Sequence, residues 1–134
     1  MNHIKRNRGF SIMETVIALV VIVLVTAAAL SITMAAISAR VKMSNYSEAQ
    51  DFAHNVLECF KAADNNTEFE SNMKDVAGYE YDDMSAEPSI YTYKVENKFE
   101  AEIIAAFDVD VDYFQITVND TNGTEIISFT YQKG

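Results

Sequence analysis

The feature that most constrains this chain is a run of 25 residues near its start, Thr15–Ala39, in which no side chain is charged. Val, Ile, Leu and Ala make up most of the run. A helix rises 1.5 Å per residue, so about 20 apolar residues cross the hydrocarbon core of a bilayer. The run therefore predicts one membrane-spanning helix. The alternative is a secretory signal peptide cut near Ala29, although such peptides usually have a shorter apolar region.

The charges of the chain are distributed very unevenly. Residues 1–9 carry +3 and the whole chain carries −10, so residues 10–134 carry −13. Three basic residues precede the apolar run, while only Arg40 and Lys42 follow it closely. Because basic residues tend to stay in the cytoplasm, this difference predicts a cytoplasmic N-terminus and an acidic domain outside. An acidic domain repels phosphate backbones, so we expect no direct contact with nucleic acid.

One acidic residue, Glu14, does not fit a simple membrane anchor. It lies four residues into the apolar stretch that begins at Phe10. A carboxylate at bilayer depth costs on the order of 3 kcal/mol, so it needs a partner or a route to water. One interpretation places Glu14 at the headgroups, where it is simply hydrated. The residues around Glu14 favour a more specific interpretation of this side chain.

Residues 6–14 read RNRGFSIME, in which a basic leader ends in Gly9, an aromatic residue follows, and Glu14 stands four residues further on. This pattern resembles the N-terminal signal of type IV prepilins and pseudopilins. In that family a membrane aspartyl peptidase cuts after the glycine, and the new N-terminal residue is often N-methylated. The resemblance implies cleavage between Gly9 and Phe10 and methylation of Phe10.

The same resemblance gives Glu14 a role in assembly. Glu14 falls at the fifth position of the mature chain, where the family carries Glu and pairs it with the N-terminal amine of the next subunit. The resemblance also implies three partners: a prepilin peptidase, an assembly platform with its ATPase, and other subunits packed through the helix of residues 10–63. The match itself covers residues 5 to about 30. It departs from many pilins in one respect, because the membrane half of the helix has no proline.

The apolar run is expected to continue into an amphipathic helix. No Gly or Pro interrupts residues 10–63, which would span about 81 Å as one helix. Beyond Arg40, apolar residues recur at spacings of three and four, which indicates a face that packs on a sheet. Asp64–Asn66 then ends the helix. The apolar face consists of Tyr46, Ala49, Ala53, Val56, Leu57 and Phe60.

The rest of the chain predicts a small head and an α+β fold. Alternation of apolar and polar residues indicates three to four antiparallel strands, and Asn122–Gly123 is a strong hairpin signal. The expected strands span 90–99, 103–111, 113–119 and 124–132. The expected organisation is a leader (1–9), a membrane or filament-core half of the helix (10–39) and a head (40–134) with helix 40–64, loop 65–89 and sheet 90–132. A short helix at 68–76 is possible within the loop.

The acids at Asp108, Asp110 and Asp112 invite a calcium interpretation. An EF-hand loop would need Gly where Tyr113 stands and an acid where Asn119 stands, so that motif fails. Alternation would instead place the three carboxylates on one solvent face of a strand, as a protected edge. We expect no metal site.

No enzyme is indicated. The sequence has no Gly-rich phosphate loop, and His54, on the amphipathic helix, has no nucleophile or ligand set around it. Cys59 is the only cysteine, so it forms no internal disulfide, and its position on the helix predicts an inert core residue. We therefore expect no catalytic residue and no cofactor.

These observations predict a structural subunit, a minor pilin-like protein of a type IV filament from a bacterium with a single, Gram-positive type of envelope. It would be a single-pass protein of the cytoplasmic membrane with its head outside, and part of a cell-surface filament after assembly. The alternatives are a pseudopilin of a competence or type II secretion machine, or an anchored extracellular binding domain. The sequence does not choose between adhesion, motility, DNA uptake and secretion.

Overall fold

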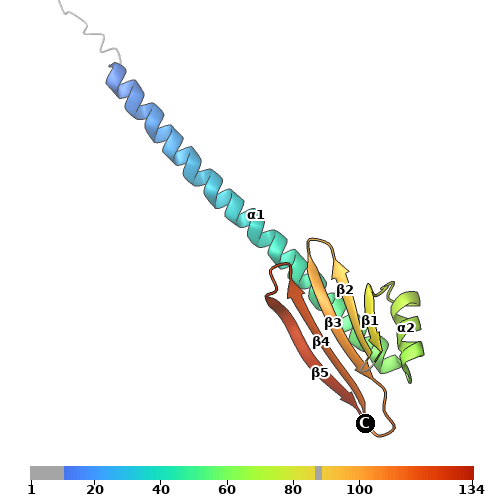
Figure 1. Cartoon of the computed structure of the whole chain (residues 1–134). Coiled ribbons are helices and arrows are strands. Elements are labelled where there is room, and N and C mark those ends of the chain that lie inside the picture. The colour runs from blue at the N-terminus through green and yellow to red at the C-terminus, as the bar shows by residue number, and fades with distance from the viewer. Residues whose placement is uncertain (1–10, 87–88) are drawn as a thin grey trace, which may run out of the picture. The chain divides into compact units, whose positions relative to one another are not determined.

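The computed structural model describes residues 11–86 and 89–134, which form two compact units that meet between Val41 and Lys42. The fold is α+β, with a long N-terminal helix that packs on an antiparallel sheet (Figure 1). The helices are α1 (Ile12–Ala62) and α2 (Asn66–Asp75). The strands are β1 (Asp83–Ala86), β2 (Ser89–Val95), β3 (Phe99–Ala106), β4 (Asp112–Asp120) and β5 (Glu125–Lys133).

The sheet has five strands in the order β1-β2-β3-β4-β5, and each neighbouring pair is antiparallel. The sheet therefore has one strand more than the upper end of the expected three to four. The additional strand is β1, whose sequence Asp-Met-Ser-Ala contains no β-branched or aromatic residue. Its pairing with β2, from Asp83 opposite Thr92 to Ala86 opposite Ser89, defines it as a strand. Residue types of low strand propensity give no local pattern from which this pairing could be predicted.

The segment expected as a loop, 65–89, holds most of the remaining differences. It contains β1, which was not expected, and α2, which corresponds to the short helix suggested at 68–76. Asn65 caps α2, because its side-chain oxygen accepts a hydrogen bond of 2.9 Å from the amide of Glu68. Glu68 reaches back to accept from the amide of Asp64 at 3.0 Å. This reciprocal capping fixes the start of α2 directly after the end of α1.

The core of the head lies between the last four turns of α1, one face of α2 and the inner face of the sheet. On α1, the expected face is confirmed at Ala49, Ala53, Val56 and Phe60, which are fully buried, while Tyr46 and Leu57 are half-buried. Aromatic rings dominate this core, and the ring centroid of Phe60 lies 5.0 Å from that of Phe114 on β4. The remaining buried residues include Phe52, Cys59, Ala63, Phe69, Met73, Tyr91, Tyr93, Phe99, Ala101, Ile103, Ala105, Ile116 and Val118.

The predicted hairpin between β4 and β5 is confirmed, and Asp120 organises its turn. The Asp120 carboxylate accepts hydrogen bonds from the amides of Asn122 at 2.8 Å and Thr124 at 3.0 Å. Gly123 has φ +80°, a left-handed conformation that glycine adopts without strain. This turn fixes the register in which Ile116 faces Phe129 and Phe114 faces Tyr131.

Candidate membrane and assembly segment

The first unit consists of the apolar part of α1. Within the described chain, α1 is the one helix that is long and apolar enough to cross a membrane, and its most apolar window buries nothing in the structure. Every described residue from 11 to 41 is exposed, including large apolar side chains such as Ile12, Ile22 and Leu24. At 1.5 Å per residue, residues 12–41 span about 45 Å, which exceeds the roughly 30 Å of a hydrocarbon core.

Several hydroxyl groups of this segment are satisfied inside the helix. Thr26 donates a hydrogen bond of 2.7 Å to the carbonyl of Ile22, and Thr33 donates one of 2.9 Å to the carbonyl of Ala29. Ser31 bonds in the same way to Ala27, at 3.0 Å. Lipid offers no hydrogen-bond partner, so polar groups in a membrane must be paired internally. The hydroxyls of Thr26, Ser31 and Thr33 meet that requirement without a second chain.

Glu14 lies in the first turn of α1 and is exposed. Its backbone amide donates a hydrogen bond of 3.2 Å to the side-chain oxygen of Ser11. The amide of Thr15 donates to the Ser11 carbonyl at 3.1 Å, so the helix begins directly after Ser11. A carboxylate in a first turn is favoured by the helix dipole, which gives Glu14 one structural role in the isolated chain.

The other residues of the predicted processing site, Gly9 and Phe10, lie outside the described residues. The structure brings together Ser11 and Glu14 instead. Sequence reasoning did not single out Ser11, although Ser-x-x-Glu before an apolar run is a recognised sequence signature of a helix start. The start of the helix at Ile12 is therefore defined by a polar cap and not only by the apolar run.

The three acids at Asp108, Asp110 and Asp112 do not share one face of a strand. β3 ends at Ala106 and β4 begins at Asp112, so the expectation of a strand over 103–111 was wrong beyond residue 106. Residues 107–111 connect the two strands, and Asp108 accepts a hydrogen bond of 2.7 Å from the amide of Val109. Because residues 107–111 form a connection and not a strand, the three acids do not alternate along a single strand. Among residues 11–86 and 89–134, no group of three His, Cys, Asp or Glu side chains is placed to hold a metal ion.

Cys59 and His54 occupy the positions expected from the helix pattern. Cys59 is buried, and His54 is exposed. Burial raises the pKa of the Cys59 thiol, and the nearby carboxylate of Glu58 raises it further. A raised pKa keeps the sulfur protonated, which is the unreactive form.

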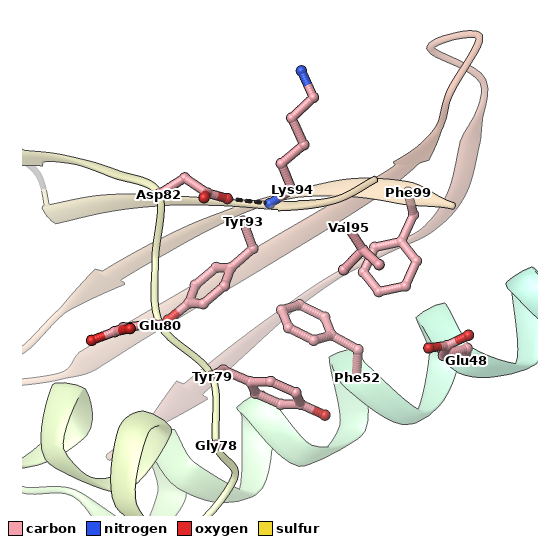
Figure 2. Close-up of a pocket in the computed structure, with 10 residues that line it drawn as sticks. All are labelled: Glu48, Phe52, Gly78, Tyr79, Glu80, Asp82, Tyr93, Lys94, Val95 and Phe99. Atoms are coloured by element: carbon pink, nitrogen blue, oxygen red, sulfur yellow. Dashed lines mark hydrogen bonds between the residues drawn. The ribbon is translucent and has the colours of Figure 1, made fainter. Parts of the chain in front are cut away.

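A hollow of about 250 Å³ lies between α1 and β2, and its floor is aromatic (Figure 2). Phe52 and Tyr93 contribute buried rings whose centroids lie 5.4 Å apart. Three carboxylates surround the hollow, and each has a partner within the chain. The partners are Lys98 for Glu48 at 2.7 Å, Lys74 for Glu80 at 3.1 Å and the amide of Lys94 for Asp82 at 2.6 Å. The hollow therefore does not present a free ligand set.

Compared with protein-family models, with curated proteins and with solved structures, the chain matches none. The architecture is pilin-like: a long apolar N-terminal helix whose later turns pack on an antiparallel sheet. The helix is consistent with a single-pass membrane anchor or with a signal sequence.

Proposed function

We propose that this chain is a pilin-like structural subunit, more specifically a minor one, of a type IV filament. A prepilin peptidase cuts the precursor between Gly9 and Phe10, and Phe10 is N-methylated. The apolar part of α1 holds the subunit in the cytoplasmic membrane with its head outside. An assembly platform then transfers the subunit into a filament, where α1 packs against the same helix of other copies.

The observation that carries this proposal is the apolar surface of α1 from Ile12 to Val41, which nothing in the structure covers. Monomeric soluble proteins rarely expose contiguous apolar patches larger than a few hundred Å². Lipid covers this surface before assembly, and neighbouring helices cover it afterwards. A filament subunit needs a helix that is stable in both surroundings, and the internally bonded hydroxyls of Thr26, Ser31 and Thr33 support that requirement.

Glu14 supports assembly over simple anchoring. In a low-dielectric surrounding a carboxylate without a cation is costly, and cleavage after Gly9 creates an amine at Phe10 only four residues away. When the amine of one copy meets Glu14 of the next, subunits in the correct axial position pair both charges. A subunit shifted along the axis leaves a buried charge unpaired.

An ordinary signal peptide fits the exposed surface less well. A cut near Ala29 would leave an apolar stretch of α1 on the mature chain in water. The exposed apolar residues that would remain are Leu30, Ile32, Met34, Ile37, Val41 and Met43. An anchored extracellular binding domain remains the rival from another class, and it would keep residues 1–9.

The test is the intact mass of the native protein, measured separately in membranes and in material sheared from the cell surface. We expect a product that begins at Phe10 and carries one methyl group, present in both fractions. A product that begins at Phe10 but stays in the membrane would mean a pilin-like protein that does not enter filaments. An uncut N-terminus, or a start near Leu30, would overturn the proposal and leave the anchored or secreted binding domain.

A further inference from the structure

The last strand, β5, forms a free edge of the sheet. The strand order places β1 at one edge and β5 at the other, and in the described part of the chain β5 pairs only with β4. β5 is nine residues long. Its outer side therefore presents a row of backbone N–H and C=O groups of the kind to which another strand adds.

This edge lacks the protection that natural sheets usually carry. Proteins interrupt exposed edges with lysine, proline, bulges or very short strands. In β5 only the two ends are charged, at Glu125 and Lys133, and the seven residues between them read IISFTYQ. The register irregularity lies at the turn end of the strand, opposite Val118 and Asn119. The central stretch is therefore regular, uncharged and free of proline.

The inner side of β5 also leaves apolar surface uncovered. Phe129 and Tyr131 face the core, yet they are only half-buried. Their partners across the ladder, Ile116 and Phe114 on β4, are fully buried. The apolar layer of the head thus continues beyond the point at which its own strands end, and one more strand would cover it.

The charge of the head limits where a second copy of this chain can supply this strand. Residues 42–134 carry −13, so two heads repel each other over most of their surfaces. The uncharged centre of β5 is a place where two heads approach without opposing like charges. This step, like those that follow, rests on the proposed function, because it assumes that copies of the chain stand side by side.

Strand direction indicates which part of the second copy fits. The sheet is an antiparallel series with an odd number of strands, so β1 and β5 run in the same direction (Figure 1). Subunits of a filament all point the same way, so a neighbour presents its β1 edge parallel to β5. Pairing β5 with another β5 in the antiparallel sense would require one copy to be reversed.

We propose that the β5 edge of one head binds the β1 edge of a neighbouring head in parallel, so that the sheet continues from subunit to subunit. The exposed residues of β1 are Asp83, Met84 and Ser85. Such a contact is heterologous: each copy uses two different edges and leaves one edge free for the next copy. Heterologous contacts that do not close into a ring build open helical assemblies.

Disulfide trapping in the full chain tests this contact in native membranes and in sheared material. Cys59 is replaced by Ala, and two versions of the chain are expressed together. One carries Ser85→Cys, and the other carries Cys at Ser128, Thr130 or Gln132. The pairing register of the strands, together with the alternation of side chains along each strand, places these positions on the outer face of the sheet, away from the core. A mild oxidant joins two thiols whose Cα atoms come within about 7 Å.

We expect a cross-linked dimer with at least one of the three β5 positions. The matched control is Glu102→Cys on β3, which has the same outward direction two strands away from the edge, and we expect no dimer with it. Normal sheared material without any cross-link would overturn the edge contact and leave the filament function standing. A cross-link in membranes without any sheared product would support the edge contact and overturn the filament function. If neither a cross-link nor a sheared product appears, both the edge contact and the filament function are overturned.

A second variant makes the test independent of cysteine chemistry. Thr130→Lys places a charge at the centre of the uncharged edge, so we expect it to lower the sheared fraction at least tenfold at an unchanged level in membranes. Glu102→Lys, on the same face, is expected to leave it unchanged. Normal shedding of the Thr130→Lys variant would contradict the proposed contact.

Discussion

The ammonium group of Lys133, at the end of the last strand, lies 3.3 Å from the carbonyl oxygen of Lys61 and 3.4 Å from that of Ala63. These carbonyls belong to the last turn of α1 and the residue after it, where backbone acceptors have no partner within the helix. A cation at this position also interacts favourably with the negative end of the helix dipole. The carboxylate of Asp64 lies 3.5 Å away. The C-terminal strand is thereby tied to the end of the helix on which it packs.

Lys133→Met should therefore lower the free energy of unfolding by about 1 kcal/mol, because Met keeps the aliphatic stem but loses the donor and the charge. Denaturant unfolding of the detergent-solubilised chain measures this. Lys94→Met, which removes an exposed lysine on β2, is the control and should change stability by less than about 0.5 kcal/mol. Equal effects of the two substitutions would exclude a capping role for Lys133.

Phe60→Ala should be the most destabilising single change in the head. Phe60 is fully buried and contacts the rings of Phe69, Phe107 and Phe114. Removing such a ring costs about 3–5 kcal/mol, a large part of the 5–15 kcal/mol that typically stabilises a domain. Val109→Ala, at a side chain that is 98% exposed, is the control and should be neutral. A loss below about 1 kcal/mol for Phe60→Ala would contradict the packing described here.

The thiol of Cys59 should react slowly in the folded chain. Burial, followed by the carboxylate of Glu58, raises the pKa of this thiol, and only the thiolate attacks thiol reagents. At pH 8 we expect labelling to be at least about tenfold slower than in denaturant. Equal rates in the two conditions would show that Cys59 is accessible.

Stability should fall at alkaline pH through two buried tyrosines. Burial raises the pKa of Tyr91, and so does the hydrogen bond of 2.8 Å that its hydroxyl donates to Glu70. Burial likewise raises the pKa of Tyr93. A raised folded-state pKa means that the stabilisation is complete below the ordinary tyrosine pKa of about 10 and is lost as the pH rises above it.

Tyr91→Phe provides the matched comparison for this pH dependence. It should cost about 1 kcal/mol at pH 7, because the hydrogen bond to Glu70 is lost. It should also make the decline above pH 10 less steep, since only Tyr93 then titrates with a strongly raised pKa. Unfolding midpoints recorded from pH 8 to pH 11 test both effects, and identical slopes in the two proteins would contradict this assignment.

Glu14→Gln should separate membrane insertion from assembly. Gln removes the charge but keeps the backbone amide that donates to Ser11, so the helix start is preserved. We expect a normal level in membranes and at least a tenfold loss in sheared material, because the amine at Phe10 of the neighbouring copy is left without its partner. Ser11→Ala is the control, since it removes the cap at a cost of about 1 kcal/mol and leaves the carboxylate. A similar loss in both variants would assign the effect to the helix start.

The elements that could be predicted from the sequence are those whose pattern is local. The spacing of Ala49, Val56 and Phe60 placed the buried face of α1 correctly, and Asn122–Gly123 placed the hairpin. Phe52 lies on the same face, but it was not included in the predicted set. β1 could not be predicted, because pairing with β2 and not residue type makes it a strand.

The candidate site likewise contains features that could be predicted from the sequence and features that could not. The first-turn position of Glu14 could be predicted from the apolar stretch that begins at Phe10, because the helix begins close to the start of that stretch, at Ile12. The cap at Ser11 was readable from Ser-x-x-Glu but was not considered. The proposed cleavage and methylation at Gly9 and Phe10 would depend on a separate enzyme, so neither the fold nor the packing of the head bears on them.

The helix α1 carries first an exposed apolar surface and then the face that packs in the head. The early position of that face in the chain affects how the head folds. Phe60 leaves the ribosome long before Phe114, its packing partner on β4. Until β4 is made, the apolar face of α1 has only the earlier partners from α2, β2 and β3, so the core of the head cannot be completed early. A chain that completes its core only with its last two strands remains unfolded while its C-terminal part is still being synthesised, and an unfolded chain is the form that passes through a narrow channel.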